Sequence, residues 1–158
     1  MAYDFNADEI FIMAEQLERN GAKFYRDSAK AVEDSASQKF LNDLAQMEDE
    51  HEKTFKSLRA EITEKEKEST VFDPEGEAAL YLRSLADSRV FFEKEMDVTS
   101  LRGILKAAIT AEKDSIVFYL GMKEAVTENL GKGRIEKIIK EEMGHIKFLS
   151  SKLISLKK

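Results

Sequence analysis

The sequence predicts an all-α protein, a four-helix bundle of two helical hairpins joined by a long crossover that contains a short extra helix. Seven glycines and one proline among 158 residues leave room for long helices. Apolar residues recur at helical spacing in four long stretches. The two halves also match without a gap, at an offset of 94 residues that places Glu18 on Glu112. We therefore expect a single domain over 1–158, with repeat halves at about 6–62 and 98–156.

The first half predicts two helices with a break at Ser35–Ser37. Asn6 is a suitable N-cap for the first helix, and Glu9, three residues later, completes the pattern of a capping box. Helical spacing then predicts which side chains of the two helices face inward. These are Ile10, Met13, Ala14, Leu17, Gly21, Phe24, Tyr25 and Ala29, followed by Phe40, Leu41, Leu44, Met47, His51, Phe55, Leu58 and Ile62.

The second half repeats this arrangement after the crossover. Residues 75–88 carry helically spaced apolar side chains and predict the short extra helix. The third long helix should start near a capping cluster at Asp97–Ser100, and the fourth after Gly131–Gly133. The inner face of the third helix should use Leu101, Leu105, Ala108, Ala111, Ser115, Phe118, Tyr119 and Met122. The fourth helix has Ile135, Ile138, Met143, Ile146, Leu149 and Leu153 among its apolar positions. Two hairpins with short links, joined by one long crossover, form a four-helix bundle that differs from the simple up-down-up-down arrangement.

Composition excludes several classes of function. The chain has no cysteine, which rules out disulfides, thiolate zinc sites and iron–sulfur clusters and fits a reducing compartment. The net charge is −6, and lysines alternate with glutamates, so there is no clustered basic face for nucleic acid. Neither a signal-peptide pattern nor an apolar run of membrane-spanning length is visible. We expect a cytoplasmic protein that binds neither nucleic acid nor a membrane.

The two histidines of the chain mark the candidate site. Each follows a glutamate by three residues, and each Glu-x-x-His unit has a further glutamate 30 residues upstream. The six residues are Glu18, Glu48, His51, Glu112, Glu142 and His145. Because positions three apart share one face of a helix, each unit can direct a carboxylate and an imidazole toward one point. One Glu from each of two helices, with a Glu-x-x-His from each of two others, is what a dinuclear metal site in a four-helix bundle requires.

The surroundings of these residues favour bound cations. Glu18 and Glu112 lie on apolar stripes, and the neighbouring layers contain no lysine or arginine. Four unpaired buried carboxylates would be costly, whereas two divalent ions neutralise them. Carboxylate with imidazole suits iron, manganese or zinc, and equal ligand numbers from the two hairpins indicate two similar ions with bridging carboxylates. The alternative is that each Glu-x-x-His is only a pair on a helix surface.

Two tyrosines are candidate supporting residues. Tyr25 and Tyr119 lie seven residues after Glu18 and Glu112, two turns along the same face. A phenol there can hydrogen-bond a metal-ligating carboxylate, or it can be a core residue whose hydroxyl finds another partner. The nearby carboxylates that the repeat does not select, and that we expect in solvent, are Glu50, Glu52 and Glu141.

At these residues the chain resembles the ferritin-like diiron-carboxylate proteins, and within them the rubrerythrin group. The motifs that carry the resemblance are the Glu-x-x-Gly-x-x-Phe-Tyr of Glu18–Tyr25 and the two Glu-x-x-His units. The resemblance covers both hairpins and implies a ferritin-like fold with two iron ions. The ligands that it implies are Glu18 and His51 on one iron, Glu112 and His145 on the other, and Glu48 and Glu142 as bridges.

This chain departs from the rubrerythrin pattern in two respects. Rubrerythrins usually carry a cysteine-ligated rubredoxin domain that supplies electrons, and a cysteine-free chain has none. They also have an additional glutamate at the position of Ser115. The resemblance therefore implies a separate electron-donor protein.

The leading functional hypothesis is a diiron-carboxylate oxidoreductase, a rubrerythrin-like peroxidase or ferroxidase. It would reduce peroxide or dioxygen with electrons from an external donor, in an oxidative-stress or iron-redox role. Three alternatives stay open: ferroxidase activity with iron storage, a dimanganese catalase-like activity, and a non-enzymatic helical module stabilised by metal. We expect a homodimer, because bundles of this size commonly bury further apolar surface through two-fold contacts.

Overall fold

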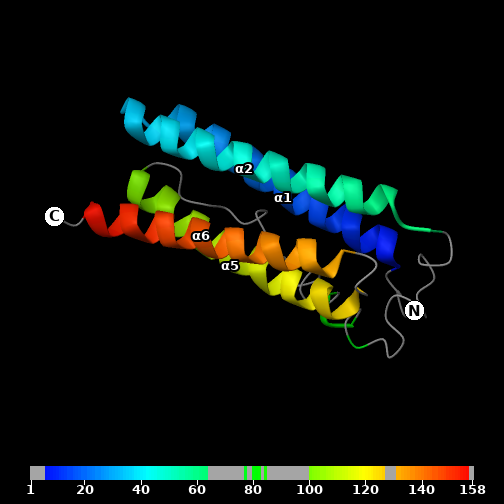
Figure 1. Ribbon diagram of the computed structural model, residues 1–158. Helices are drawn as coiled ribbons and strands as arrows, with labels where there is room; N and C mark the ends of the chain where they lie inside the picture. The colour runs from blue at the N-terminus through cyan, green and yellow to red at the C-terminus, as the bar shows by residue number, and fades with distance from the viewer. Residues whose placement is uncertain are drawn as a thin grey trace.

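The computed structural model describes residues 6–63, 77, 80–82, 84, 100–126 and 131–156. Over these residues the long helices are α1 (Ala7–Ala31), α2 (Ser35–Ala60), α5 (Leu101–Ala125) and α6 (Lys132–Ser155). They pack as a bundle in which α1 with α2, and α5 with α6, form antiparallel hairpins (Figure 1). α2 ends and α5 begins at opposite ends of the bundle, as the predicted long crossover between the hairpins requires. The all-α, four-helix prediction is confirmed.

Part of the short crossover helix can be compared with the structure. Glu77, Leu80–Leu82 and Ser84 are helical, and Leu82 is fully buried. The rest of the predicted segment, 75–88, lies outside the described residues. No helix in the described part of the chain is long and apolar enough to cross a membrane.

Side-chain caps set the starts of three long helices. The predicted capping box is present, since Asn6 Oδ1 accepts from the Glu9 amide at 2.9 Å and Glu9 Oε2 accepts from the Asn6 amide at 3.2 Å. Ser100 caps α5 with a single bond, in which its Oγ accepts from the Gly103 amide at 3.0 Å. The predicted break at Ser35–Ser37 is wrong, because Asp34 accepts from the Ser37 amide at 2.8 Å and α2 therefore begins at Ser35.

Gly131 sets the start of α6 without a side-chain cap. Its φ of 91° lies in the left-handed region, which glycine adopts at no steric cost. A Cβ at this position would also lie 2.3 Å from Cδ2 of Leu58 on α2. The helix begins directly afterwards at Lys132, so Gly133 belongs to its first turn rather than to the predicted break.

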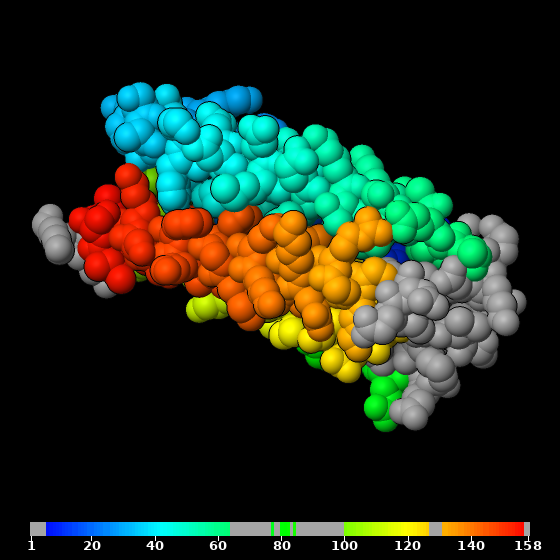
Figure 2. All heavy atoms as spheres, viewed as in Figure 1, coloured from blue at the N-terminus to red at the C-terminus, as the bar shows by residue number. Residues whose placement is uncertain are grey.

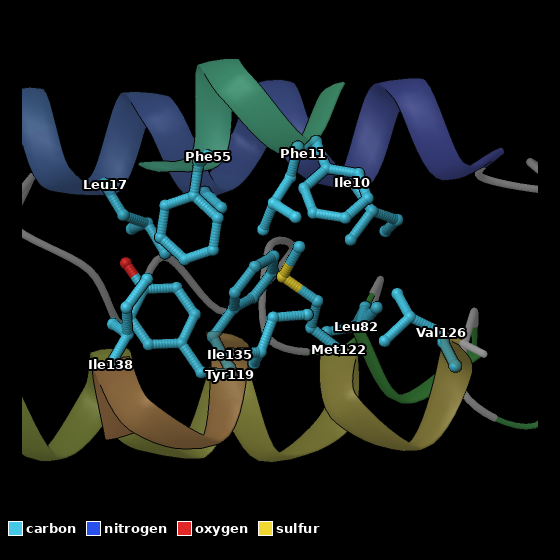
Figure 3. Close-up of a cluster of buried hydrophobic side chains, with 14 of the residues drawn as sticks. Ile10, Phe11, Leu17, Phe55, Leu82, Tyr119, Met122, Val126, Ile135 and Ile138 are labelled. Atoms are coloured by element: carbon cyan, nitrogen blue, oxygen red, sulfur yellow. The ribbon is translucent and has the colours of Figure 1, made fainter. Parts of the chain in front are cut away.

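Two apolar clusters fill the bundle and leave a layer between them. The first lies toward the start of α1 and the end of α2 (Figure 3) and includes Ile10, Phe11, Leu17, Phe55, Tyr119, Met122, Ile135 and Ile138. The second lies toward the other end and includes Phe24, Tyr25, Leu41, Leu44, Ile104, Leu105, Ala108 and Leu149. In every long helix the glutamate of the candidate site falls between residues of the first cluster and residues of the second.

Two methionines at the predicted apolar positions of their helices are exposed rather than buried in the core. Met47 and Met143 are 42% and 52% exposed. Each is next to a buried glutamate, Glu48 or Glu142, and successive helical residues are turned by about 100°, which carries the methionine to the edge of the inward face.

Candidate metal centre

The structure brings the six predicted residues together in one layer between the apolar clusters. All six are at most 4% exposed. They form two overlapping groups, which are Glu18, Glu48, His51 and Glu142, and Glu48, Glu112, Glu142 and His145. Within each group, one donor atom of every residue lies within 4.8 Å of the others. Glu48 and Glu142 belong to both groups, which is the geometry expected of carboxylates shared by two ions.

Both imidazoles direct Nδ1 toward the carboxylates. His51 Nδ1 lies 3.0 Å from Glu142 Oε1 and 3.4 Å from Glu18 Oε2. His145 Nδ1 lies 2.9 Å from Glu142 Oε2 and 3.3 Å from Glu48 Oε1. The two rings are nearly parallel, with centroids 5.7 Å apart and an interplanar angle of 18°. The same ring nitrogen of each histidine is therefore available to a cation in the layer.

The other ring nitrogen of each histidine has a different partner. His51 Nε2 lies 2.7 Å from Glu141 Oε2 on α6, and His145 Nε2 lies 3.1 Å from Met47 Sδ on α2. Glu141 is exposed to solvent as expected, with a side chain that is 44% exposed, and it contacts His51 in addition. The helical spacing of one hairpin could not show this contact, because it depends on how the two hairpins are aligned. Glu50 lies in solvent as expected and pairs with Lys53. Glu52 does not, because its side chain is only 13% exposed and pairs with Arg19 and Lys56.

The two tyrosines hydrogen-bond glutamates of the site. Tyr25 on α1 donates to Glu112 Oε1 on α5 at 2.5 Å. Tyr119 on α5 donates to Glu18 Oε1 on α1. Burial and the surrounding carboxylates raise the pKa of both phenols well above the ordinary value, so both remain protonated donors. The two bonds are related by the sequence repeat and cross between the hairpins.

The carboxyl groups of the layer have divergent pKa values. Burial, and then the neighbouring carboxylates, raise the pKa of Glu48 and Glu142 well above the ordinary value. Burial acts in the same direction on Glu112, but contacts with His145, Glu142 and Tyr25 outweigh it and lower the Glu112 pKa.

The pKa values of both imidazoles are raised, whereas burial alone would lower them. Burial lowers the pKa of His145, but its contacts with Glu112 and Glu48 raise it to about 10. Burial also lowers the pKa of His51, and contacts with Glu18 and Glu141 reverse this into a raised value. Without metal, the layer therefore balances its charge by retaining protons.

Unsatisfied atoms test whether cations fit the layer. Glu18 Oε2, Glu48 Oε1, Glu142 Oε2 and His145 Nδ1 are buried and have no partner in hydrogen-bond geometry. Within the described residues, every ion pair of the four glutamates is made with a histidine. Glu15, one turn before Glu18, shows the contrast, because it is buried but pairs with an arginine, Arg59, whose Nη2 donates to its Oε1 at 3.1 Å. Buried polar atoms without partners are costly, so this donor set fits two cations.

A pocket of about 410 Å³ reaches the histidines from the surface. It opens between α2 and α6, the two helices on the face shown in Figure 2. The lining residues are Met47, Glu50, His51, Glu141, Gly144, His145 and Phe148. The layer is therefore accessible to small molecules from the side on which the two Nε2 atoms lie.

Comparison with known proteins shows the fold of the chain. No protein-family model and no curated protein matches the sequence. A crystal structure from Thermotoga maritima, of a protein described as ferritin-like and diiron-carboxylate, is similar with a TM-score of 0.70. The two sequences are 24% identical, and the similarity covers 94% of each chain. The ferritin-like fold is confirmed, whereas membership of the rubrerythrin group stays a prediction.

Proposed function

We propose that this protein is a diiron-carboxylate oxidoreductase that reduces peroxide or dioxygen with electrons from a separate donor protein. The observation that carries the proposal is the pair of overlapping ligand groups that share Glu48 and Glu142 in a buried layer. The description of the Thermotoga maritima protein, which has the same fold, supports the same class of site.

The donor set determines which metals suit the layer. Four carboxylates and two imidazoles favour iron or manganese over softer metals, and four carboxylates neutralise two divalent ions. Glu18 and His51 would hold one ion and Glu112 and His145 the other, with Glu48 and Glu142 between them. Two ferrous ions supply two electrons, which with two protons convert one hydrogen peroxide to two waters.

The protein's own groups position the ligands and control access. Tyr25 and Tyr119 hold Glu112 and Glu18 from the opposite hairpin, so both terminal carboxylates are fixed before metal binds. The two apolar clusters, one toward each end of the bundle, exclude water from both sides of the layer. The pocket between α2 and α6 leaves a path for a small oxidant, which a closed structural metal site does not need.

The test is an anaerobic reaction of the ferrous protein. The full chain is loaded with two equivalents of Fe(II) and mixed with one equivalent of hydrogen peroxide, and the remaining Fe(II) is measured with a ferrous chelator. We expect rapid loss of both ferrous ions, followed by no turnover until a reductant is added. Glu112→Ala should slow the loss strongly, whereas Asp43→Ala, a change at an exposed position of α2 paired with Lys39, should not.

Other outcomes would favour the remaining hypotheses. A ferrous form that is inert to both peroxide and dioxygen, together with peroxide disproportionation by the manganese-loaded form, would replace the proposal with a dimanganese catalase-like function. Metal that stabilises the fold without any redox reaction would indicate a structural module. A cage-like assembly in light scattering that retains many iron ions per chain would indicate storage.

A further inference from the structure

Met47 and Glu141 occupy equivalent positions in the sequence repeat and in the structure. The offset that places Glu48 on Glu142 also places Met47 on Glu141. Each contacts Nε2 of the histidine on the facing helix, Glu141 at 2.7 Å from His51 and Met47 at 3.1 Å from His145. The two half-sites therefore differ in the group behind the imidazole, a carboxylate in one and a thioether in the other.

This difference acts on the strength of each imidazole as a ligand. Nδ1 of each ring faces the carboxylate layer, so a cation bound there leaves the ring hydrogen on Nε2. A carboxylate is a strong, charged acceptor for that hydrogen, whereas a thioether is a weak one. A carboxylate behind a ligating histidine fixes the ring and increases its basicity.

The rest of the layer does not introduce a comparable difference. The tyrosine bonds are paired by the repeat, and Glu48 and Glu142 belong to both groups. Glu50 also lines the pocket beside the histidines, but its carboxylate pairs with Lys53 at 2.8 Å. Among the groups that contact the Nε2 atoms, Glu141 and Met47 are therefore the residues that distinguish the two imidazoles.

We infer that Glu141 and Met47 make the two metal half-sites unequal, so that the ions bind in order. The half-site of Glu18 and His51, supported by Glu141, binds the first ion and binds it more tightly. The half-site of Glu112 and His145, in which Met47 contacts the ring, binds the second ion more weakly. This inference rests on the proposed dinuclear site and makes both residues positioning residues that act through the histidines.

The chain offers a direct way to follow the order of binding, because it contains only two histidines. Protein labelled with ¹⁵N-histidine is titrated with Zn²⁺, a diamagnetic probe, and the two sets of ring signals are assigned with a His145→Gln variant. We expect the first equivalent of zinc to shift the His51 signals and the second to shift those of His145. Isothermal titration of the same samples gives the two affinities.

Reciprocal substitutions test the cause of the order. Met47→Glu should strengthen the second step, and Glu141→Met should weaken the first, each by about 10–100-fold, the range found for groups that support metal ligands. Met47→Leu, which keeps an apolar side chain, should leave the order unchanged. Met143→Glu adds the same charge as Met47→Glu at an exposed position of α6 and should not strengthen the second step.

The inference and the proposed function fail in different ways. Two zinc ions of equal affinity, His145 filled first, or affinities unaffected by both reciprocal substitutions would overturn the inference and leave the dinuclear site intact. Absence of binding by either Zn²⁺ or anaerobic Fe(II) would instead overturn the proposed function.

Discussion

Tyr25 of α1 donates its hydroxyl hydrogen to Glu112 of α5, although Glu18 lies two turns away on its own helix. Tyr119 of α5 makes the matching bond to Glu18. Backbone packing in the bundle is mostly within each hairpin, α1 with α2 and α5 with α6. The phenol–carboxylate bonds therefore tie the two hairpins together at the level of the candidate metal centre.

Removing a tyrosine hydroxyl should destabilise the metal-free protein. Tyr25→Phe leaves Glu112 without the 2.5 Å bond, and a buried acceptor that loses its partner costs about 1–3 kcal/mol. Tyr119→Phe should destabilise the protein by a similar amount, because Glu18 then loses the bond from Tyr119. Urea unfolding measures both. Tyr81→Phe is the control, because the Tyr81 hydroxyl donates to the Val117 carbonyl at an exposed site and its loss should change stability by less than about 0.5 kcal/mol. Equal effects at all three positions would contradict this role.

Metal binding should release protons from the layer. The raised pKa values favour protons on Glu48, Glu142, His51 and His145 in the metal-free protein. Two ions need these groups as carboxylates and neutral imidazoles, so saturation at pH 6 should release up to about four protons per chain, one from each group. Isothermal titration with Zn²⁺ in buffers of different ionisation enthalpy counts them. Release of fewer than about two would show that the carboxyl groups are already ionised before metal binds.

Two glycines of one turn should respond oppositely to substitution by alanine. Gly131→Ala places a side chain at a φ of 91° and 2.3 Å from Leu58, so it should destabilise the protein by about 1–3 kcal/mol. Gly133→Ala introduces a Cβ with nothing within 4 Å, in the first turn of α6, and should stabilise it by up to about 1 kcal/mol. Thermal unfolding of the two variants compares them. Stabilisation by both would contradict the left-handed conformation of Gly131.

Helical periodicity was sufficient to predict the bundle and the inward direction of the glutamates, because each prediction concerns the phase of one helix. The glutamates lie on the same stripes as Leu17 and Leu44, which are buried. The start of α2 depended instead on which of several neighbouring residues acts as the N-cap. Asp34 takes this position, and the serines that follow belong to the helix.

Helical periodicity could not predict the contacts between the two hairpins. The repeat identifies Met47 and Glu141 as counterparts, but only the alignment of α2 with α6 brings each of them to a histidine. The same holds for Tyr25, whose own helix offers Glu18 at the right spacing while the fold supplies Glu112. Periodicity within one helix cannot decide between Glu18 and Glu112 as the acceptor for Tyr25, since both are compatible with an inward-facing tyrosine.

The stability of the metal-free and metal-bound proteins should depend on pH in opposite directions. Glu48, Glu142, His51 and His145 have raised pKa values in the folded protein, so the folded state holds protons that the unfolded chain has already lost. Their contribution to stability is complete below the unfolded pKa values, about 4.5 for glutamate and 6.5 for histidine, and is lost as pH rises. The lowered pKa of Glu112 acts in the opposite sense, but only below about pH 4.5.

The melting temperature of the metal-free protein should therefore fall steadily from pH 5 to pH 9. Metal ions compete with the same protons, so metal affinity, and with it the stabilisation of the loaded protein, should rise over the same range. The comparison uses metal-free and zinc-loaded samples in matched buffers. Glu48→Gln combined with Glu142→Gln provides the control, because neutral amides cannot lose a proton and should flatten the curve of the metal-free protein. A metal-free melting temperature that stays flat or rises between pH 5 and pH 8 would show that the folded layer retains no more protons than the unfolded chain, and the charge balance inferred for it would be wrong.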